Sequence, residues 1–215
     1  MISIFYCERC IMFKKENWEN VLGRYRLIKE LYIECEETDP SLKTNLQPLN
    51  EFRAALDHTY RIIDIEINGD NSLYESEFDK LNSHLRRTFF DVCDMLAINY
   101  RNKIVEMLKI YLPEDIETAI PEYYPQIRPD IEKIDGNIAE YRKDKGNIKK
   151  EETVVLNYYS DVIKLRDMYK MILLRIPSLK EIKKKKCRFS IFNWIVGIAG
   201  ILSLIVAVIF EIFKC

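Results

Sequence analysis

The feature that most constrains this chain is a long segment without charge, which runs from Phe189 to Phe210. A helix needs about 20 predominantly apolar residues to cross the hydrocarbon core of a bilayer, and this segment is long enough. The alternative is a buried helix of a soluble core, but such helices are usually shorter and carry a polar stripe. The segment is apolar on all sides, so it predicts one transmembrane helix over residues 189–213.

The basic residues on either side of this segment predict its orientation. Those before it are Lys183, Lys184, Lys185, Lys186 and Arg188, whereas Lys214 alone follows it. Because basic residues stay preferentially on the cytoplasmic side, we expect a single-pass protein of the inner (cytoplasmic) membrane whose N-terminal domain lies in the cytoplasm. We expect residues 178–188 to form a basic juxtamembrane linker helix that also attracts anionic head groups.

Small residues recur within the apolar segment. Gly197, Gly200 and Ser203 are spaced by three, and Ala199, Ser203 and Ala207 are spaced by four. Such spacing lets helices approach closely, so we expect self-association through Gly197, Gly200, Ser203 and Ala207. A ring of these helices could line a pore. The alternative is that glycine and alanine are ordinary in membrane helices, and both interpretations remain open.

Residues 1–177 predict a helical cytoplasmic domain. Gly and Pro are scarce, at 6 and 7, and 48% of the residues are hydrophobic. The expected helices cover about residues 14–37, 48 to the turn at 68–72, 73–112 (as one helix, straight or kinked, or as two), 129–145 and 151–175. Pro177 is expected to end the last of these, with Ser178 capping the linker helix. The stretch with Pro121, Pro125 and Pro129 predicts a loop or a broken turn, and ISIFYC near the N-terminus is the one candidate strand. The predicted fold is all-α, an antiparallel helical bundle followed by one transmembrane helix.

Neither a metal nor a cofactor is expected. The CERC stretch, Cys7 to Cys10, is half of a zinc-ribbon pattern, but no second cysteine pair follows it. We interpret the cysteines as thiols in a reducing cytosol. A strand–turn–helix phosphate loop is also missing from the pattern. The formal net charge of -1 gives no overall field for nucleic acid, so such a partner would need a local basic patch.

The two histidines of the chain lie in similar stretches, NEFRAALDHTYRIID and NSHLRRTFFDVCD. Basic and acidic residues lie three or four positions apart in both, so they share helix faces. If the two helices pack antiparallel, the stretches face each other and form a cationic patch, with Asp57 and Asp91 holding the arginines. The predicted ligand-binding residues are Arg53, His58, Arg61, His84, Arg86 and Arg87.

Arginine forks match phosphate groups, so the expected ligand of this patch is a nucleotide or an oligonucleotide. The alternative is that the arginines and aspartates form routine surface ion pairs and that each histidine is a partly buried residue of the bundle. Spacing alone leaves both interpretations open.

The segment RAALDH, Arg53 to His58, resembles the R-x4-H motif of the HEPN superfamily. It also resembles a bacterial helical family with an RNALDH-like segment. HEPN proteins are helical bundles, usually dimeric; many are metal-independent ribonucleases in toxin, CRISPR and antiphage systems, and others only bind nucleotides. The resemblance implies that Arg53 stabilises a scissile phosphate and that His58 is the catalytic acid–base. Ala54 stands where the motif usually has a polar residue.

Together these features predict a membrane-anchored oligomeric effector of the kind found in antiviral defence. Its helical domain would bind a nucleotide or oligonucleotide and control a bundle of transmembrane helices that permeabilises the membrane. One alternative is a membrane-tethered HEPN-type ribonuclease, and another is an anchored scaffold for a partner protein. The expected partners are the membrane, further copies of this chain, the nucleotide ligand and a co-encoded regulatory protein.

Overall fold

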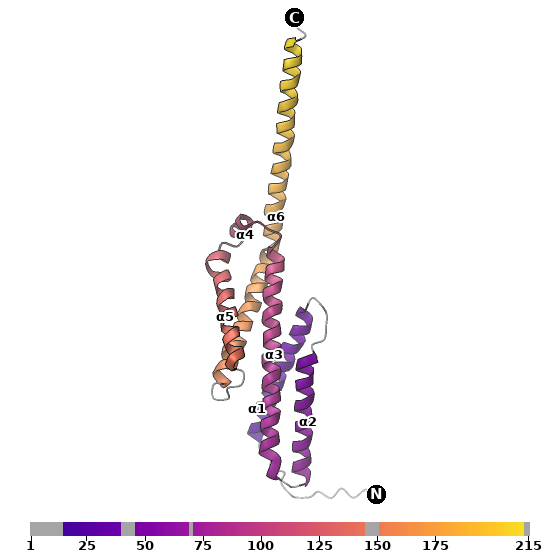
Figure 1. Ribbon diagram of the computed structural model, residues 1–215, viewed down its shortest axis with the longest axis vertical. Coiled ribbons are helices and arrows are strands. Elements are labelled where there is room, and N and C mark those ends of the chain that lie inside the picture. Colours follow the sequence, from indigo (N-terminus) through magenta and orange to yellow (C-terminus); the bar gives the residue numbers. More distant parts are fainter. Residues whose placement is uncertain (1–14, 40–45, 69–70, 145–150, 213–215) are drawn as a thin grey trace, which may run out of the picture. The chain divides into compact units, whose positions relative to one another are not determined.

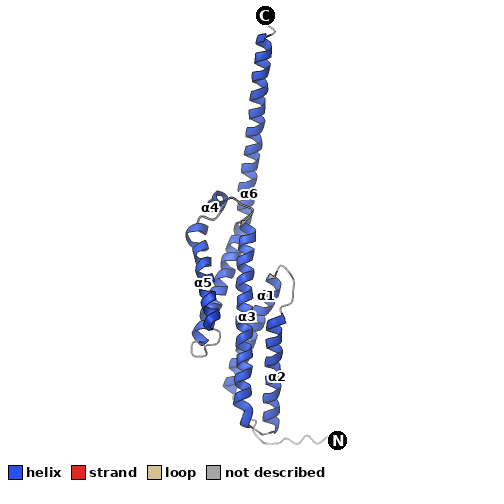
Figure 2. Ribbon diagram, in the orientation of Figure 1, coloured by secondary structure: helices blue, strands red, loops and turns tan. Residues whose placement is uncertain are grey.

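The computed structural model describes residues 15–39, 46–68, 71–144 and 151–212. Within these ranges the chain folds into helices and contains no strand (Figure 2). The predicted all-α fold, a helical bundle followed by a long apolar helix, is therefore confirmed for the part of the chain that the structure describes. The candidate strand ISIFYC lies outside the described residues.

Most helices begin and end near the proline, glycine and polar residues that predicted turns, and Figure 1 shows their order. They are α1 (Lys15–Thr38), α2 (Leu46–Asn68), the 3-10 turn η1 (Asn71–Leu73), α3 (Tyr74–Leu108), α4 (Pro113–Ala119), the π-helical turn η2 (Tyr123–Ile127), α5 (Arg128–Asp144) and α6 (Glu151–Ile212). Pro113 opens α4, a position where its missing N–H costs nothing. Of the alternatives left open for residues 73–112, the structure has one helix, α3, over residues 74–108, and not two. In the stretch predicted to be a loop or a broken turn, Pro121 lies in a turn, Pro125 lies in the π-helical turn η2, and Pro129 falls in the first turn of α5.

The prediction that Pro177 ends a helix is wrong. Pro177 lies inside α6, which continues through it, so residues 178–188 are the middle of α6 and not a separate helix capped by Ser178. Proline removes the hydrogen bond to the carbonyl four residues earlier, which belongs to Leu173. Pro177 and Leu173 are both exposed, so solvent can replace that bond, and the helix formers on either side preserve the helix.

The helices group into two compact units. The first consists of Met1–Asn102 with Lys133–Arg166, and the second of Lys103–Glu132 with Asp167–Cys215. The core of the first unit draws fully buried side chains from several helices, including Ile28 of α1, Ile62 of α2 and Leu165 of α6. Burial of each such side chain contributes about 1.5–3 kcal/mol, so apolar packing accounts for this arrangement.

The second unit contains part of the basic segment of α6. Its core includes Ile104, Ile120, Ile172 and Leu179. Lys183 Nζ donates a hydrogen bond to the backbone carbonyl of Ile110 at 3.0 Å, and it lies over the ring of Tyr111. Lys186 forms an ion pair with Asp115, whose carboxylate is buried. Two of the lysines expected to contact lipid head groups therefore have partners within this unit.

The C-terminal part of α6 has the properties of a membrane span. Among the described residues, α6 is the one helix long and apolar enough to cross a bilayer. From residue 189 to residue 209 every side chain is exposed, although most are large and apolar. Such a surface is unfavourable in water and suits lipid, so the structure is compatible with a single-pass membrane protein.

Candidate functional site

The two histidines meet between α2 and α3. Their rings stack with centroids 5.2 Å apart and planes 19° apart. His58 of α2 contacts Glu77 of α3, and Glu51 of α2 contacts His84 of α3. Residue numbers therefore rise along one helix as they fall along the other, which means that the two helices pack antiparallel. The sequence analysis anticipated this arrangement of the two stretches.

The facing stretches share a sequence pattern. EFRAALDHTYR (51–61) and EFDKLNSHLRR (77–87) both fit E-F-x5-H-x2-R. Because the helices are antiparallel, the glutamate of each stretch lies beside the histidine of the other. The arginine three residues after each histidine then reaches the same glutamate. The site is thus two copies of one contact set, related by a local pseudo-twofold axis.

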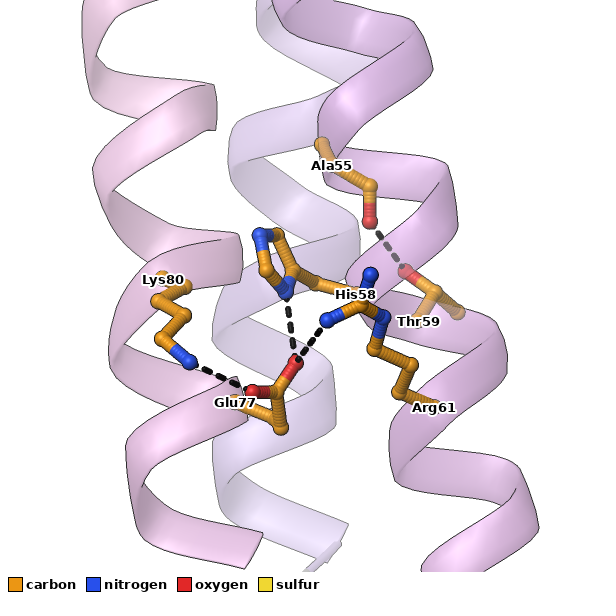
Figure 3. Close-up of polar contacts among 6 residues, drawn as sticks. All are labelled: Ala55, His58, Thr59, Arg61, Glu77 and Lys80. Atoms are coloured by element: carbon orange, nitrogen blue, oxygen red, sulfur yellow. Dashed lines mark hydrogen bonds and ion pairs between the residues drawn. The ribbon is translucent and has the colours of Figure 1, made fainter. Parts of the chain in front are cut away.

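The contacts of each glutamate are short. Glu77 Oε2 lies 2.6 Å from His58 Nδ1, and Glu77 Oε1 accepts a hydrogen bond from Lys80 Nζ at 2.6 Å (Figure 3). Arg61 approaches the same carboxylate at 3.8 Å. In the second set, Glu51 Oε2 lies 2.7 Å from His84 Nδ1 and 3.6 Å from Arg87. Both sets therefore centre on a carboxylate.

Glu77 is the most buried member of the cluster, with a side chain only 7% exposed. Its hydrogen bonds from Lys80 and His58 lower its pKa to about 2, so it is ionised at neutral pH. An ionised carboxylate only accepts hydrogen bonds, so the Nδ1 atom of His58 carries the proton and donates. The Nε2 atom of neutral His58 is then the nitrogen able to accept a proton.

The structure divides the predicted ligand-binding residues into three groups. His58, Arg61, His84 and Arg87 belong to the carboxylate-centred cluster. Arg53 is exposed, and among the described residues no hydrogen bond or ion pair joins it to either histidine. Arg86 follows His84 by two residues, about 200° around the helix, and lines a groove against α1.

The glutamates are the residues that the sequence analysis missed. It assigned the arginines to Asp57 and Asp91, whereas the ion pairs of Arg61 and Arg87 go to Glu77 and Glu51. The repeated E-F dipeptide, which starts seven residues before each histidine, was the available signal. Two carboxylates also offset the cationic groups, so this face carries less positive charge than the arginines alone suggest.

Metal binding finds no support in the described part of the chain. No group of three or more histidine, cysteine, aspartate or glutamate side chains there is arranged to hold a metal ion. Cys7 and Cys10 of the CERC stretch lie outside the described residues. Cys35 and Cys93 are free and buried, and burial raises the pKa of Cys35 to about 12, so it remains a thiol.

Comparisons with models of protein families, with curated proteins and with solved structures each found no significant match. The function must therefore be inferred from the residues and their geometry.

Glu77→Gln is expected to lower the free energy of unfolding at pH 7 by about 1–3 kcal/mol, because His58 and Lys80 lose their charged partner. The folded-state pKa of Glu77 is depressed from 4.5 to about 2. Its contribution is therefore fully present above pH 4.5 and is lost as the pH falls toward 2. Thermal unfolding of the full chain in mild detergent should show the wild type and the variant converging over this range.

The control is Glu132→Gln, which removes one exposed ion pair with Arg128 and should change stability by less than about 1 kcal/mol. A constant difference between wild type and Glu77→Gln from pH 7 to pH 2 would contradict the assigned role of the charge.

Proposed function

We propose that this chain is a membrane-anchored effector of the inner membrane. Its helical domain, on the cytoplasmic side, binds a nucleotide or oligonucleotide and controls how the apolar ends of several α6 helices associate. Association in one arrangement permeabilises the membrane, as in antiviral defence. A co-encoded regulatory protein is a further proposed partner.

The observation that best supports this proposal is that α6 is one uninterrupted helix from residue 151 to residue 212. The same helix supplies Leu165 to the core of the first unit, Leu179 to the core of the second, and then the whole apolar segment. A continuous α-helix can carry rotation and translation along its length, because its backbone hydrogen bonds are internal. A simple anchor needs no such coupling, since a loop between domain and span would serve equally well.

The surface of the apolar segment supports self-association. A Cβ atom added at Gly197 or Gly200 would meet nothing within 4 Å. The chain's own packing therefore does not require glycine at either position. Close approach of a neighbouring helix along Gly197, Gly200, Ser203 and Ala207 would account for these small residues.

Inserting alanines between Arg188 and Phe189 tests whether the helical domain is coupled through α6 to the apolar segment. The insertion follows Lys186, so the contacts of Lys183 with Ile110 and of Lys186 with Asp115 stay intact. Two alanines rotate the apolar segment by about 200° relative to the bundle, whereas seven restore its direction to within about 20°. We expect the two-residue insertion to abolish depolarisation of induced cells and the seven-residue insertion to retain it, as followed with a membrane-potential dye.

Equal behaviour of the two insertions would contradict the coupling and leave α6 as a passive anchor. Cells that keep both their membrane potential and their RNA would instead indicate an anchored scaffold. The seven-residue variant serves as the matched control, because it lengthens the chain more than the variant expected to fail.

A second candidate function is a membrane-tethered HEPN-type ribonuclease with Arg53 and His58 as its catalytic pair. The observation that favours it is the His58 Nδ1–Glu77 contact, which leaves Nε2 available for acid–base chemistry. In the same induced cells, cleavage of RNA before any loss of membrane potential, in both insertion variants, would favour this function over permeabilisation.

A further inference from the structure

We infer that the loop between α3 and α4 is a second membrane contact, in which the side chains of Ile110 and Leu112 insert into the interfacial layer of the bilayer that the apolar segment crosses. This inference rests on the membrane anchoring in the proposed function and gives the second unit a partner of its own, the lipid surface. The loop covers residues 109–112, between the end of α3 at Leu108 and the start of α4 at Pro113.

The loop is held against α6 just before the apolar segment begins. Lys183 Nζ, on α6, donates a hydrogen bond to the backbone carbonyl of Ile110 at 3.0 Å and lies 5.6 Å from the centre of the Tyr111 ring. Three residues further along α6, Lys186 forms an ion pair with the buried carboxylate of Asp115, in the first turn of α4. Both lysines and their partners belong to the second unit, so these contacts lie within one compact unit.

Buried and exposed side chains alternate in the loop. Tyr111 is buried, as are Ile116 and Ile120 of the segment that follows, and these side chains hold the loop in place. Ile110 and Leu112, on either side of Tyr111, are 56% and 59% exposed. Single exposed apolar residues are ordinary on protein surfaces, so exposure alone does not indicate a partner. What distinguishes these two residues is their position along α6.

That position places the loop at the depth of the lipid head groups. With a rise of about 1.5 Å per residue, Lys186 and Lys183 lie about 4.5 and 9 Å before Phe189, where the apolar segment begins. The head-group layer on each side of the hydrocarbon core is about 5–7 Å thick. Lys186 therefore lies within this layer and Lys183 just outside it, so the loop that they hold reaches the layer.

Lipid is the occupant that fits the exposed side chains. A bilayer crossed by the apolar segment surrounds α6 at Phe189, so lipid lies beside Ile110 and Leu112 without any further component. Tyrosine and lysine are also residue types that anchor proteins at membrane interfaces, and here Lys183 lies over the ring of Tyr111. A protein partner at this place would have to displace lipid head groups.

Charge supports the contact but does not dominate it. Lys184, Lys185 and Arg188 are exposed on α6 and attract anionic head groups. Glu114 and Glu117 are exposed on α4 and oppose that attraction. Because these carboxylates offset part of the positive charge, insertion of the apolar side chains is the main contribution. The contact should therefore persist in a bilayer of zwitterionic lipid.

A second contact beside the span matters for the proposed control of α6. The tilt of a membrane helix is set partly by anchors at the interface, so the loop resists changes in the depth and tilt of α6. Helix α3 begins in the first unit, continues into the second and ends at this loop. The loop is therefore a second connection, besides α6 itself, through which a movement of the first unit can reach the membrane.

Quenching of tryptophan fluorescence by brominated acyl chains measures the contact. The chain has 2 tryptophans, so Trp18→Phe with Trp194→Phe gives a background without tryptophan. In that background, Leu112→Trp in vesicles of brominated phosphatidylcholine should lose at least about a third of the emission seen in unbrominated vesicles, since an interfacial indole reaches the upper acyl chains. The matched control is Leu174→Trp, which is 79% exposed on the same helix as the span. It lies about 22 Å before Phe189 and should lose less than about a tenth of its emission.

Two further measurements separate the possible failures. Ile110→Trp in the same background should be quenched like Leu112→Trp, so the result does not depend on one substitution. Trp18→Phe alone leaves Trp194, in the apolar segment, as a reporter of the anchor. Strong quenching of Trp194 with Leu112→Trp and Ile110→Trp quenched no more than Leu174→Trp would overturn the inference and leave the anchor standing.

Absence of quenching at Trp194 would instead contradict the membrane anchor of the proposed function, and the inference with it. Quenching of Leu112→Trp as expected, in a protein that never depolarises cells, would contradict the proposed permeabilisation and leave the membrane contact of the loop standing.

Discussion

A chain that carries Leu202→Arg together with Ile205→Arg will leave the membrane fraction on alkaline extraction, whereas the wild-type chain will stay. Both residues lie near the middle of the apolar segment, and both are exposed. An arginine at the centre of a membrane helix costs about 2.5–3.5 kcal/mol, so two of them oppose insertion strongly. Quantifying the chain in the membrane pellet and in the supernatant measures the effect.

The matched control is Leu173→Arg with Leu174→Arg, two exposed leucines of the same helix that precede the basic segment. These positions lie outside the apolar segment, so the control should remain in the pellet. If the Leu202 and Ile205 variant also remained there, another part of the chain would be responsible for attachment to the membrane.

Most of the fold could be predicted because local signals and tertiary structure agree. The turns near Asn71 and Pro113 and the apolar periodicity between them are properties of neighbouring residues. Pro177 is the exception, since its cost depends on whether the carbonyl of Leu173 can meet solvent. That exposure is decided by tertiary structure, so the sequence pattern could not supply it.

The candidate site could be predicted in part. Spacing placed His58 opposite His84 only together with the assumption that the two helices pack antiparallel, and the structure has that packing. Helical spacing also puts Arg86 on a different side of α3 from His84. The prediction of one patch that contains all the arginines did not take this into account. The groove beside Arg86 could not have been found, because it depends on how α1 lies against α3, and no residue pattern within one helix encodes that register.

Asp161→Ala is expected to destabilise the first unit severely. Asp161 of α6 is buried, and its Oδ2 atom accepts hydrogen bonds from Asn137 Nδ2 and Tyr141 Oη of α5, both at 2.9 Å. Burial and the bond to Asp161 raise the pKa of Tyr141 to about 12, so its hydroxyl is a donor at neutral pH. Each partly buried donor left without an acceptor costs roughly 1–3 kcal/mol, against a total stability of about 5–15 kcal/mol for a typical protein.

Thermal and urea unfolding of the full chain in mild detergent, followed by circular dichroism, measure this loss. Asp161→Asn retains an acceptor oxygen at the same place and should lose less stability than Asp161→Ala. Asp135→Ala removes a more exposed partner of Arg101, 3.1 Å away, and should cost less than about 1 kcal/mol. If Asp161→Ala were no more harmful than Asp135→Ala, the contact between α5 and α6 would not depend on this carboxylate. The proposed coupling requires α6 to pack stably against α5. That packing would then have to depend on apolar contacts alone.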